Sequence, residues 1–363
     1  MTSGRSEKKL ANFLAEQGVA AATPSLRVQA FIGGRKKIDF QTGDDWTYYD
    51  WASLTKIVFS VSSLMLAVDE GDIAIGDRVD EWVPELSDFP FRLRDLVTHS
   101  AGLEWWKPFY ERAKRGKDPG DAWRILIEDV LKSVRKHHAR RLGAVPSVYS
   151  DLDFFLLGEI LMRATLAPLG ERWVELSDRL DLHSTCFHAT KKTWAEPGVV
   201  WSPERVKLTA PTEYDRKRAK GCLQGVVHDE NAWALGGAAP HAGLFGPIED
   251  LSRYGLELRK LARGEKSRLP AVGARFLRRA IPRKQGDWAL GFMMPTKGSA
   301  SCGPRFSLSS IGHTGFTGTS LWYDPKQDLL VTILSNRVSP TRENKAFVGL
   351  RPQIHSEVVR LLS

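Results

Sequence analysis

The stretch that most constrains the fold begins at Ser53 and continues as an apolar helix to about Val68. Apolar residues recur there at helical spacing, and neighbouring apolar positions widen the stripe, so the sequence predicts a buried helix. The stripe consists of Ile57, Val58, Val61, Leu64, Met65 and Val68. Asp69-Glu70-Gly71 is expected to close it. At 363 residues the chain is long enough for one large domain or two of ordinary size.

Ser53 and Lys56 lie three residues apart, on one face of the first turn of this helix. Free backbone N–H groups and the positive end of the helix dipole surround a serine at that position and favour a developing anion. An amine held against the hydroxyl in a dry core can lose its proton and act as a base. The pair therefore predicts that Ser53 is a nucleophile activated by Lys56. The alternative is that Ser53 only caps the N-terminus of the helix.

The Ser-x-x-Lys spacing also occurs from Ser6 to Lys9 and from Ser133 to Lys136, so the spacing alone is a weak signal. Those two copies lie in charged, polar surroundings, where a lysine keeps its proton. Only Ser53 heads a long apolar helix.

Composition excludes several classes of protein. Hydrophobic residues make up 42% of the chain and charged residues 26%, as is typical of soluble globular proteins. Three widely separated cysteines predict neither a disulfide framework nor a Cys-x-x-Cys metal site. Residues 1–17 are polar and no window approaches a membrane span. The sequence as written predicts a cytoplasmic protein, or a periplasmic or extracellular one if an export signal has been removed.

The formal net charge of +9 would favour anionic partners. A basic run at residues 135–141 carries no interleaved aromatics, so we interpret it as a solvated helix end and expect no nucleic-acid partner. His228, Asp229 and His241 are a possible metal set, but their spacing fits no standard zinc pattern. We therefore expect no metal and no cofactor.

Both ends of the chain contain predicted strands. Residues 26–32 alternate as a strand, Gly33-Gly34 forms a turn, and residues 37–40 return as a second strand. Near the other end, residues 311–323 are predicted to be a strand, residues 324–328 a turn and residues 329–334 another strand. Helices are expected at 251–262 and 271–280, and a terminal helix at 344–362 covers the sheet.

The middle of the chain is predicted to be mainly helical. An α/β domain of residues 1–71 and 232–363, with an inserted helical domain of residues 72–231, places a site in the cleft between them. An aromatic cluster on a loop of the insert is either additional core, the default interpretation, or the wall of a ligand pocket. It consists of Trp105, Trp106, Phe109 and Tyr110.

Two further motifs follow Ser53-Leu-Thr-Lys56 in chain order. Tyr149-Ser-Asp151 stands just before an apolar helical segment, and His313-Thr-Gly315 stands on a predicted strand. With these motifs the chain resembles the serine β-lactamase and penicillin-binding protein superfamily, in particular the group of class C β-lactamases and serine D-Ala-D-Ala carboxypeptidases. Other similar stretches lie at residues 96–103, 227–231, 241–245 and 315–318.

The resemblance implies a fold and a mechanism. The fold is the α/β (α+β) β-lactamase/transpeptidase-like fold, an antiparallel sheet flanked by helices with an inserted all-helical domain. Ser53 would be acylated, and Lys56 and Tyr149 would activate it and shuttle the proton, either being the base. The backbone N–H groups of Ser53 and Phe316 would form the oxyanion hole.

The resemblance also implies that Asp151, His313, Thr314 and Gly315 bind the substrate. Two of them depart from the β-lactamase pattern. Asp151 replaces an asparagine that donates to the substrate amide, and an ionised carboxylate cannot donate, although it can pair with Lys56. His313 replaces lysine, and a neutral imidazole attracts a substrate carboxylate less than an ammonium does.

The predicted function is a serine hydrolase that acts on a small-molecule or peptide substrate through an acyl-enzyme. A penicillin-binding-type D-Ala-D-Ala carboxypeptidase acting on peptidoglycan-like D-amino-acid peptides comes first, with β-lactams as covalent ligands. An esterase of the same fold acting on short acyl esters is the main alternative. A class C-like β-lactamase and a non-catalytic sensor or binding module follow.

Overall fold

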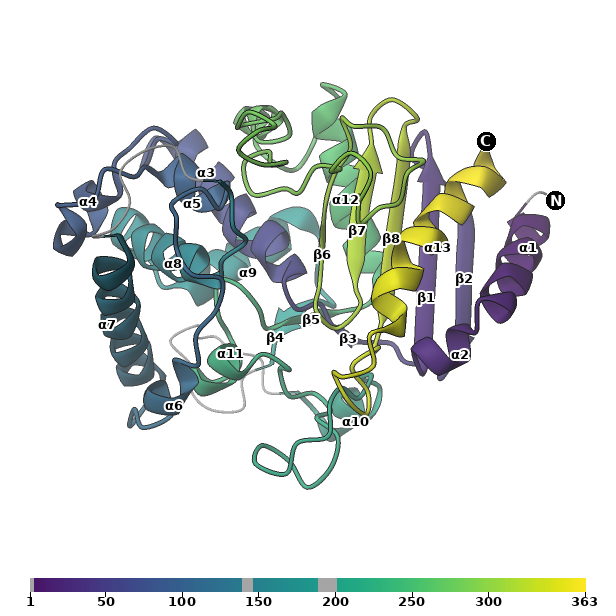
Figure 1. The fold of residues 1–363 in the computed structure, drawn as a ribbon, viewed down its shortest axis with the longest axis horizontal. Helices are drawn as coiled ribbons and strands as arrows, with labels where there is room; N and C mark the ends of the chain where they lie inside the picture. Colours follow the sequence, from purple (N-terminus) through teal and green to yellow (C-terminus); the bar gives the residue numbers. More distant parts are fainter. Residues whose placement is uncertain (1–2, 139–145, 189–200) are drawn as a thin grey trace.

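The computed structural model describes residues 3–138, 146–188 and 201–363, and its centre is a five-stranded antiparallel sheet (Figure 1). The strand order is β2-β1-β8-β7-β6, so the two ends of the chain meet where β1 pairs with β8. The strands are β1 (Ser25–Ile32), β2 (Arg35–Gly43), β6 (Ile311–Thr314), β7 (Ser320–Asp324) and β8 (Leu329–Ser335).

Alternate residues of the sheet face two separate apolar layers. In β8, Val331 and Ile333 pack with α1 (Ser3–Glu16) and α13 (Ala346–Leu362), whereas Leu330 and Leu334 belong to the layer that includes α12 (Ile248–Ala262). This follows from the two-residue period of a strand, whose successive side chains point to opposite faces. Both faces of the sheet are thus covered.

The predicted helix after Ser53 is buried, and Gly71, in a left-handed conformation at φ 84°, ends it as expected. It begins, however, with a π-helical segment η1 (Lys56–Val61) and becomes α-helical only in α3 (Ser62–Glu70). The wider turn of a π-helix leaves some backbone carbonyls outside the regular helical hydrogen-bond pattern. The Ile57 carbonyl accepts from the Tyr254 hydroxyl at 2.6 Å and from Ser62 Oγ at 3.1 Å.

Helices from the middle of the chain surround η1 and α3 on the side away from the sheet (Figure 1). Phe59 of η1 packs edge-on against Trp173 and Phe187, with ring centroids 6.0 and 5.3 Å away. The core is therefore continuous across the predicted domain boundary, and the division at residues 71 and 231 stays a prediction. The helices are α4 (Val79–Trp82), α5 (Leu93–Val97), α6 (Tyr110–Ala113), α7 (Pro119–His138), α8 (Asp151–Thr165), α9 (Leu169–Leu180) and α11 (Glu230–Ala234).

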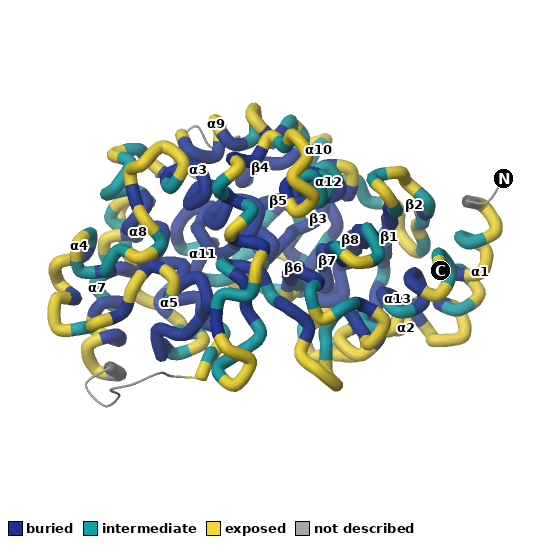
Figure 2. Tube along the Cα trace, turned by 90° about the horizontal axis from the view of Figure 1, so that it is seen from above, coloured by how far each residue is buried: buried dark blue, intermediate teal, exposed yellow. Residues whose placement is uncertain are grey.

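A second, small sheet joins the two parts of the chain in the order β3-β5-β4. It consists of β3 (Tyr49–Asp50), β5 (Leu244–Gly246) and β4 (Cys186–Phe187). Of the basic run at residues 135–141, residues 135–138 end α7, and residues 139–141 lie outside the described part of the chain. Burial is deepest where the helices meet the two sheets, and exposed residues form the outer loops (Figure 2). No described helix is long and apolar enough to cross a membrane.

Two sequence predictions need correction. The helix expected at 271–280 is only the short 3₁₀ turn η3 (Ala271–Arg275), because the chain then leaves the helix and Arg279 bridges to Ala289. Residues 311–323 are not one strand. The chain turns at Gly315 to Thr319, and β6 pairs antiparallel with β7.

Gly312 of β6 allows this hairpin to close next to the site. A Cβ atom there would lie 2.2 Å from the Leu321 carbonyl oxygen and 2.5 Å from the Trp322 ring. We expect Gly312→Ala to lower the free energy of unfolding by about 1–3 kcal/mol, because the backbone must move. Gly349→Ala, at a helical position with open space around it, is the control and should not destabilise. Urea denaturation of both variants measures the difference, and equal stabilities would contradict this account.

Candidate active site

Ser53 stands at a strained bend between β3 and η1. The preceding residue, Ala52, has a φ of 48°, which is uncommon for a residue with a side chain. The buried Asp50 carboxylate holds the bend, since it accepts hydrogen bonds from the Ala52 N–H at 2.8 Å and from the His228 N–H at 2.7 Å. The bend leaves the Ser53 N–H without an acceptor among the described residues.

Lys56 is fully buried and directs its Nζ to three acceptors. These are the Asp151 carboxylate at 2.7 Å, Ser53 Oγ at 3.2 Å and the His241 carbonyl at 3.3 Å. Three acceptors match the three N–H donors of an ammonium. Burial lowers the pKa of Lys56, but Asp151 and Tyr149 together more than offset burial, and the net pKa is raised. The expectation that a dry core removes the Lys56 proton is therefore wrong for the resting site.

Tyr149 approaches Ser53 from the loop before α8. Its hydroxyl donates to Ser53 Oγ at 2.8 Å, and its ring stacks on Trp288 with centroids 6.3 Å apart. Burial raises the pKa of Tyr149, although the Lys56 charge opposes the increase. Ser53 Oγ thus accepts from a neutral phenol and from an ammonium. One of the two must lose its proton before Ser53 can, and the pair titrates as a coupled system.

The β6–β7 turn, which begins at the third motif, is fastened to the chain just before Ser53. Thr317 and Thr319 donate their hydroxyls to the Asp50 and Trp51 carbonyls at 2.8 and 3.0 Å. Gly315 packs so closely that a Cβ atom there would lie 2.6 Å from the Trp51 carbonyl oxygen. These contacts bring the turn against Ser53, and the Phe316 N–H, like that of Ser53, has no acceptor in the described part of the chain. Two unengaged amides beside a nucleophile are the donors that an oxyanion hole needs.

His313 is buried beside Tyr149, with ring centroids 5.9 Å apart. Burial, with a smaller contribution from the Lys56 charge, lowers the pKa of His313 to about 3, so the imidazole is neutral. Its Nδ1 lies 2.8 Å from the Thr314 carbonyl oxygen and donates to it. His313, Thr314 and Gly315 are not among the described residues that line the cavity, whereas Asp151 is.

A cavity of about 310 Å³ opens in front of Ser53. Two residues of the predicted aromatic cluster, Trp105 and Trp106, line it, and Phe109 is buried in the core instead. Phe316 forms another apolar wall. The cavity is lined by Ala52, Ser53, Trp105, Trp106, Tyr149, Asp151, His228, Asp229, Glu230, His241, Ala242, Phe316 and Arg342.

Arg342 is a wall residue that no pattern in the sequence pointed to. It lies outside every motif, and its guanidinium binds Glu213 and Glu230, each at 2.6 Å. Although burial opposes the change, His228 and Arg342 lower the pKa of Glu213 to about 2. The charge of Arg342 is thus neutralised by two carboxylates.

The metal set considered from the sequence is only partly assembled. Asp229 and His241 are 2.9 Å apart and, with Asp151, offer ligand atoms within 4.8 Å of one another, but His228 pairs with Glu213 at 3.2 Å. Asp151 is already bound to the Lys56 ammonium, which would repel a metal cation. We therefore assign no metal to these residues.

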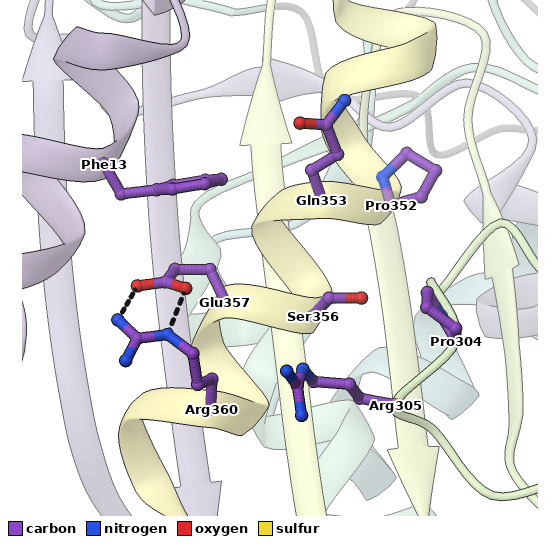
Figure 3. A pocket seen from close by; sticks show the side chains of 8 residues that line it. All are labelled: Phe13, Pro304, Arg305, Pro352, Gln353, Ser356, Glu357 and Arg360. Carbon is purple, nitrogen blue, oxygen red and sulfur yellow. Dashed lines mark hydrogen bonds and ion pairs between the residues drawn. The ribbon is translucent and has the colours of Figure 1, made fainter.

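A second hollow, of about 290 Å³, lies between α1 and α13 (Figure 3). Among the described residues that line it, Glu357 is the one carboxylate and is ion-paired with Arg360, and none is a lysine, histidine or tyrosine. Ser356 has no base beside it in this set, and we assign no chemistry to the hollow.

Comparison with known proteins agrees with this geometry. The sequence profile of the beta-lactamase family matches residues 14–350. The chain belongs to the beta-lactamase family. It is a serine hydrolase of the beta-lactamase fold. A Salmonella gallinarum protein provisionally named D-alanyl-D-alanine carboxypeptidase is 28% identical over 307 residues, 80% of this chain and 69% of the relative.

Solved structures share the fold over nearly the whole length of this chain. EstCE1, described as a hydrolase with promiscuous acyltransferase activity, is 18% identical with a TM-score of 0.69 over 98% of both chains. A class C beta-lactamase from Rhodobacter sphaeroides is 18% identical with a TM-score of 0.68, over 98% of this chain and 99% of that one. At such identities the likeness establishes the fold alone.

The buried Lys56–Asp151 pair makes a stability prediction. We expect Asp151→Asn to lower the free energy of unfolding at pH 7 by about 3 kcal/mol, because it leaves a buried ammonium without its carboxylate. Burial then holds the pKa of Lys56 below the unfolded value of about 10.4. The unfolded variant therefore binds more protons than the folded one in that interval, and its deficit should shrink as the pH rises from 7 to 10.

Urea denaturation of both proteins across that pH range measures the effect. Asp39→Asn, which breaks an exposed pair with Lys36, is the matched control and should change stability little at either pH. A deficit for Asp151→Asn that stays constant with pH would show that Lys56 is not the group responsible.

Proposed function

We propose that this hydrolase forms its acyl-enzyme on Ser53 and that Lys56 and Tyr149 carry the proton. The observation that supports this most is the convergence of an amine nitrogen at 3.2 Å and a phenol oxygen at 2.8 Å on one hydroxyl oxygen. Once Lys56 or Tyr149 has released its own proton to water, Ser53 Oγ attacks a carbonyl carbon while its proton passes to that base, and the pair then protonates the leaving group. Water hydrolyses the ester formed on Ser53.

The oxyanion of each tetrahedral intermediate is proposed to lie against the backbone N–H groups of Ser53 and Phe316. Both amides are unengaged and belong to segments that the threonine hydroxyls of the β6–β7 turn hold together. Donors fixed before the reaction stabilise developing charge at little reorganisation cost.

The substrate that we propose first is a D-alanyl peptide of the peptidoglycan type, cleaved by carboxypeptidase action. The name of the Salmonella relative, at 28% identity over 80% of this chain, supports this choice. Asp151 and Thr314 would bind polar groups of the peptide, with His313 and Gly315 shaping that end of the site. A β-lactam would acylate the same serine.

The second candidate is an esterase acting on short acyl esters, and a specific observation favours it. His313 is neutral, and Lys56 and Arg342, the cations at the site, are both bound to carboxylates. A substrate carboxylate therefore finds no unpaired cation among the described residues of the cavity wall. The same feature argues against efficient β-lactamase action.

Two probes separate these candidates. The protein is incubated in parallel with a fluorescent penicillin and with a fluorophosphonate, and the labelled residue is mapped by mass spectrometry. Labelling of Ser53 by both probes, with release of D-alanine from a D-Ala-D-Ala peptide, supports the carboxypeptidase. Labelling by the fluorophosphonate alone, with hydrolysis of a p-nitrophenyl ester, supports the esterase. Absence of both labels contradicts the acyl-enzyme.

Ser53→Ala should abolish labelling and reduce hydrolysis by about 10³-fold or more, because no other hydroxyl meets the amine and the phenol. Ser6→Ala removes the serine of another Ser-x-x-Lys copy and is the control that should keep full activity. Circular dichroism checks that both variants fold. Full activity of folded Ser53→Ala would exclude the mechanism.

Tyr149→Phe keeps the ring and removes only the hydroxyl. We expect the rate of Ser53 acylation to fall by about 10²–10⁴-fold, the usual contribution of a positioned proton carrier. Stopped-flow measurement of fluorophosphonate labelling gives this rate, and an unchanged rate would assign the proton transfer to Lys56 alone.

A further inference from the structure

The segment that follows α5 contributes no group to the chemistry described above, yet several hydrogen bonds connect it to the loop that contains Tyr149. Five hydrogen bonds join residues 98–105 to residues 147–151. They run from Ser147 Oγ to the Thr98 carbonyl (2.8 Å), from Val148 N to the His99 carbonyl (2.9 Å), from Ser150 N to His99 Nδ1 (3.2 Å), from Ser150 Oγ to the Glu104 carbonyl (2.5 Å) and from Asp151 N to the Trp105 carbonyl (3.0 Å).

His99 is the central residue of this set of hydrogen bonds. It is 1% exposed and has a left-handed backbone at φ 53°, a conformation that non-glycine residues adopt rarely. Its carbonyl binds the residue before Tyr149 and its ring nitrogen binds the residue after it. The ring itself lies against the Tyr149 ring, with centroids 4.8 Å apart, and against Trp288 at 4.5 Å.

The protonation of His99 follows from its two neighbours. The Ser150 N–H can only donate, so His99 Nδ1 carries the lone pair and the proton is on Nε2. Asp153 Oδ2 is 2.7 Å from the same Nδ1, so as a neutral carboxylic acid it donates to that lone pair and shares it with the longer contact from the Ser150 N–H. Burial agrees with this, since it holds the pKa of Asp153 well above and the pKa of His99 well below the ordinary values.

We propose that His99, oriented by neutral Asp153, is the positioning residue that keeps the Tyr149 hydroxyl within hydrogen-bonding distance of Ser53 Oγ. The inference rests on the proposed function of Ser53 and Tyr149 and extends it to a pair that touches neither substrate nor nucleophile. A shift of about 1 Å in a catalytic group can cost about 10²-fold in rate. Besides His99, the titratable groups that face Tyr149 in the described structure are Lys56, Asp151 and His313. The ring of His99 is hydrogen-bonded to Asp153 and Ser150 instead of to these three side chains.

A matched pair of substitutions tests the role. His99→Asn places an amide oxygen near the position of Nδ1 and tolerates the left-handed backbone, whereas His99→Gln carries its amide one carbon further. We expect His99→Gln to lower the limiting rate of fluorophosphonate labelling by about 10–100-fold, to leave its half-saturating concentration unchanged and to shift the pH profile of the rate. His99→Asn should retain most of the rate and the wild-type profile.

His355→Gln is the control, because His355 is another fully buried neutral histidine, bound to Ser320 Oγ at 2.9 Å and outside the site. It should lose stability without a change in the pH profile. If His99→Gln behaves like His355→Gln, or if His99→Asn and His99→Gln lose rate equally with an unshifted profile, the positioning role is refuted and His99 is structural only.

A readout that needs no activity separates this inference from the proposed function. The Tyr149 signal in protein labelled with ¹³C at tyrosine Cζ is assigned by its loss in Tyr149→Phe, and its titration is followed with pH. We expect a changed chemical shift and midpoint in His99→Gln and wild-type values in His99→Asn. Identical Tyr149 titrations in all three proteins would overturn the inference even if Ser53 proved unreactive, and a changed titration with an unreactive Ser53 would refute only the proposed function.

Discussion

The ion pair between Lys56 and Asp151 is the interaction on which the site depends. An unpaired ammonium is too costly to bury, so the fully enclosed Lys56 side chain requires a carboxylate at hydrogen-bond distance. Asp151 provides it from the first residue of α8, far from η1 in sequence. The pair therefore ties the helix that follows Ser53 to the helix that follows Tyr149, and Tyr149 is placed against Ser53 as a consequence.

The same pair decides the chemistry available at rest. A lysine that accepts a proton from serine must first give up its own. Lys56 and Tyr149, which both contact Ser53 Oγ, are therefore treated as one coupled pair rather than as two separate pKa values. Pairing recurs around the cavity, where Asp229 binds His241 and Arg342 binds two glutamates. The wall consequently presents aromatic surface and neutralised charge, which selects substrates by shape and hydrogen bonding more than by net charge.

How well the sequence predicted each part of this site depended on whether the interactions that form it are local in the sequence or join distant residues. The Ser53 helix, the strands at both ends and the convergence of Ser53, Lys56 and Tyr149 were predictable, because each is carried by a motif or a periodicity. The protonation state of Lys56 was predicted wrongly. Its burial can be inferred from the apolar pattern, but the effect of Asp151 on its pKa depends on the distance between the two side chains, which only the structure provides. Arg342 carried no local signal at all. The π-helical segment η1 depends on a hydrogen bond from the Tyr254 hydroxyl, which lies on another helix. The helix expected at 271–280 does not form in full, because Arg279 pairs with Ala289 in a β-bridge.

The proposed oxyanion hole has a different structural origin from the proposed proton-transfer groups. Its two amides are set by the strained bend at Ala52 and by the β6–β7 turn, which Thr317 and Thr319 fasten to the chain just before Ser53. None of these contacts involves Lys56, Asp151 or Tyr149. The fold therefore holds the two proposed oxyanion donors and the Lys56–Tyr149 pair through separate sets of contacts. A substitution beside the pair can then change its hydrogen bonds without moving the amides proposed to stabilise the tetrahedral intermediate.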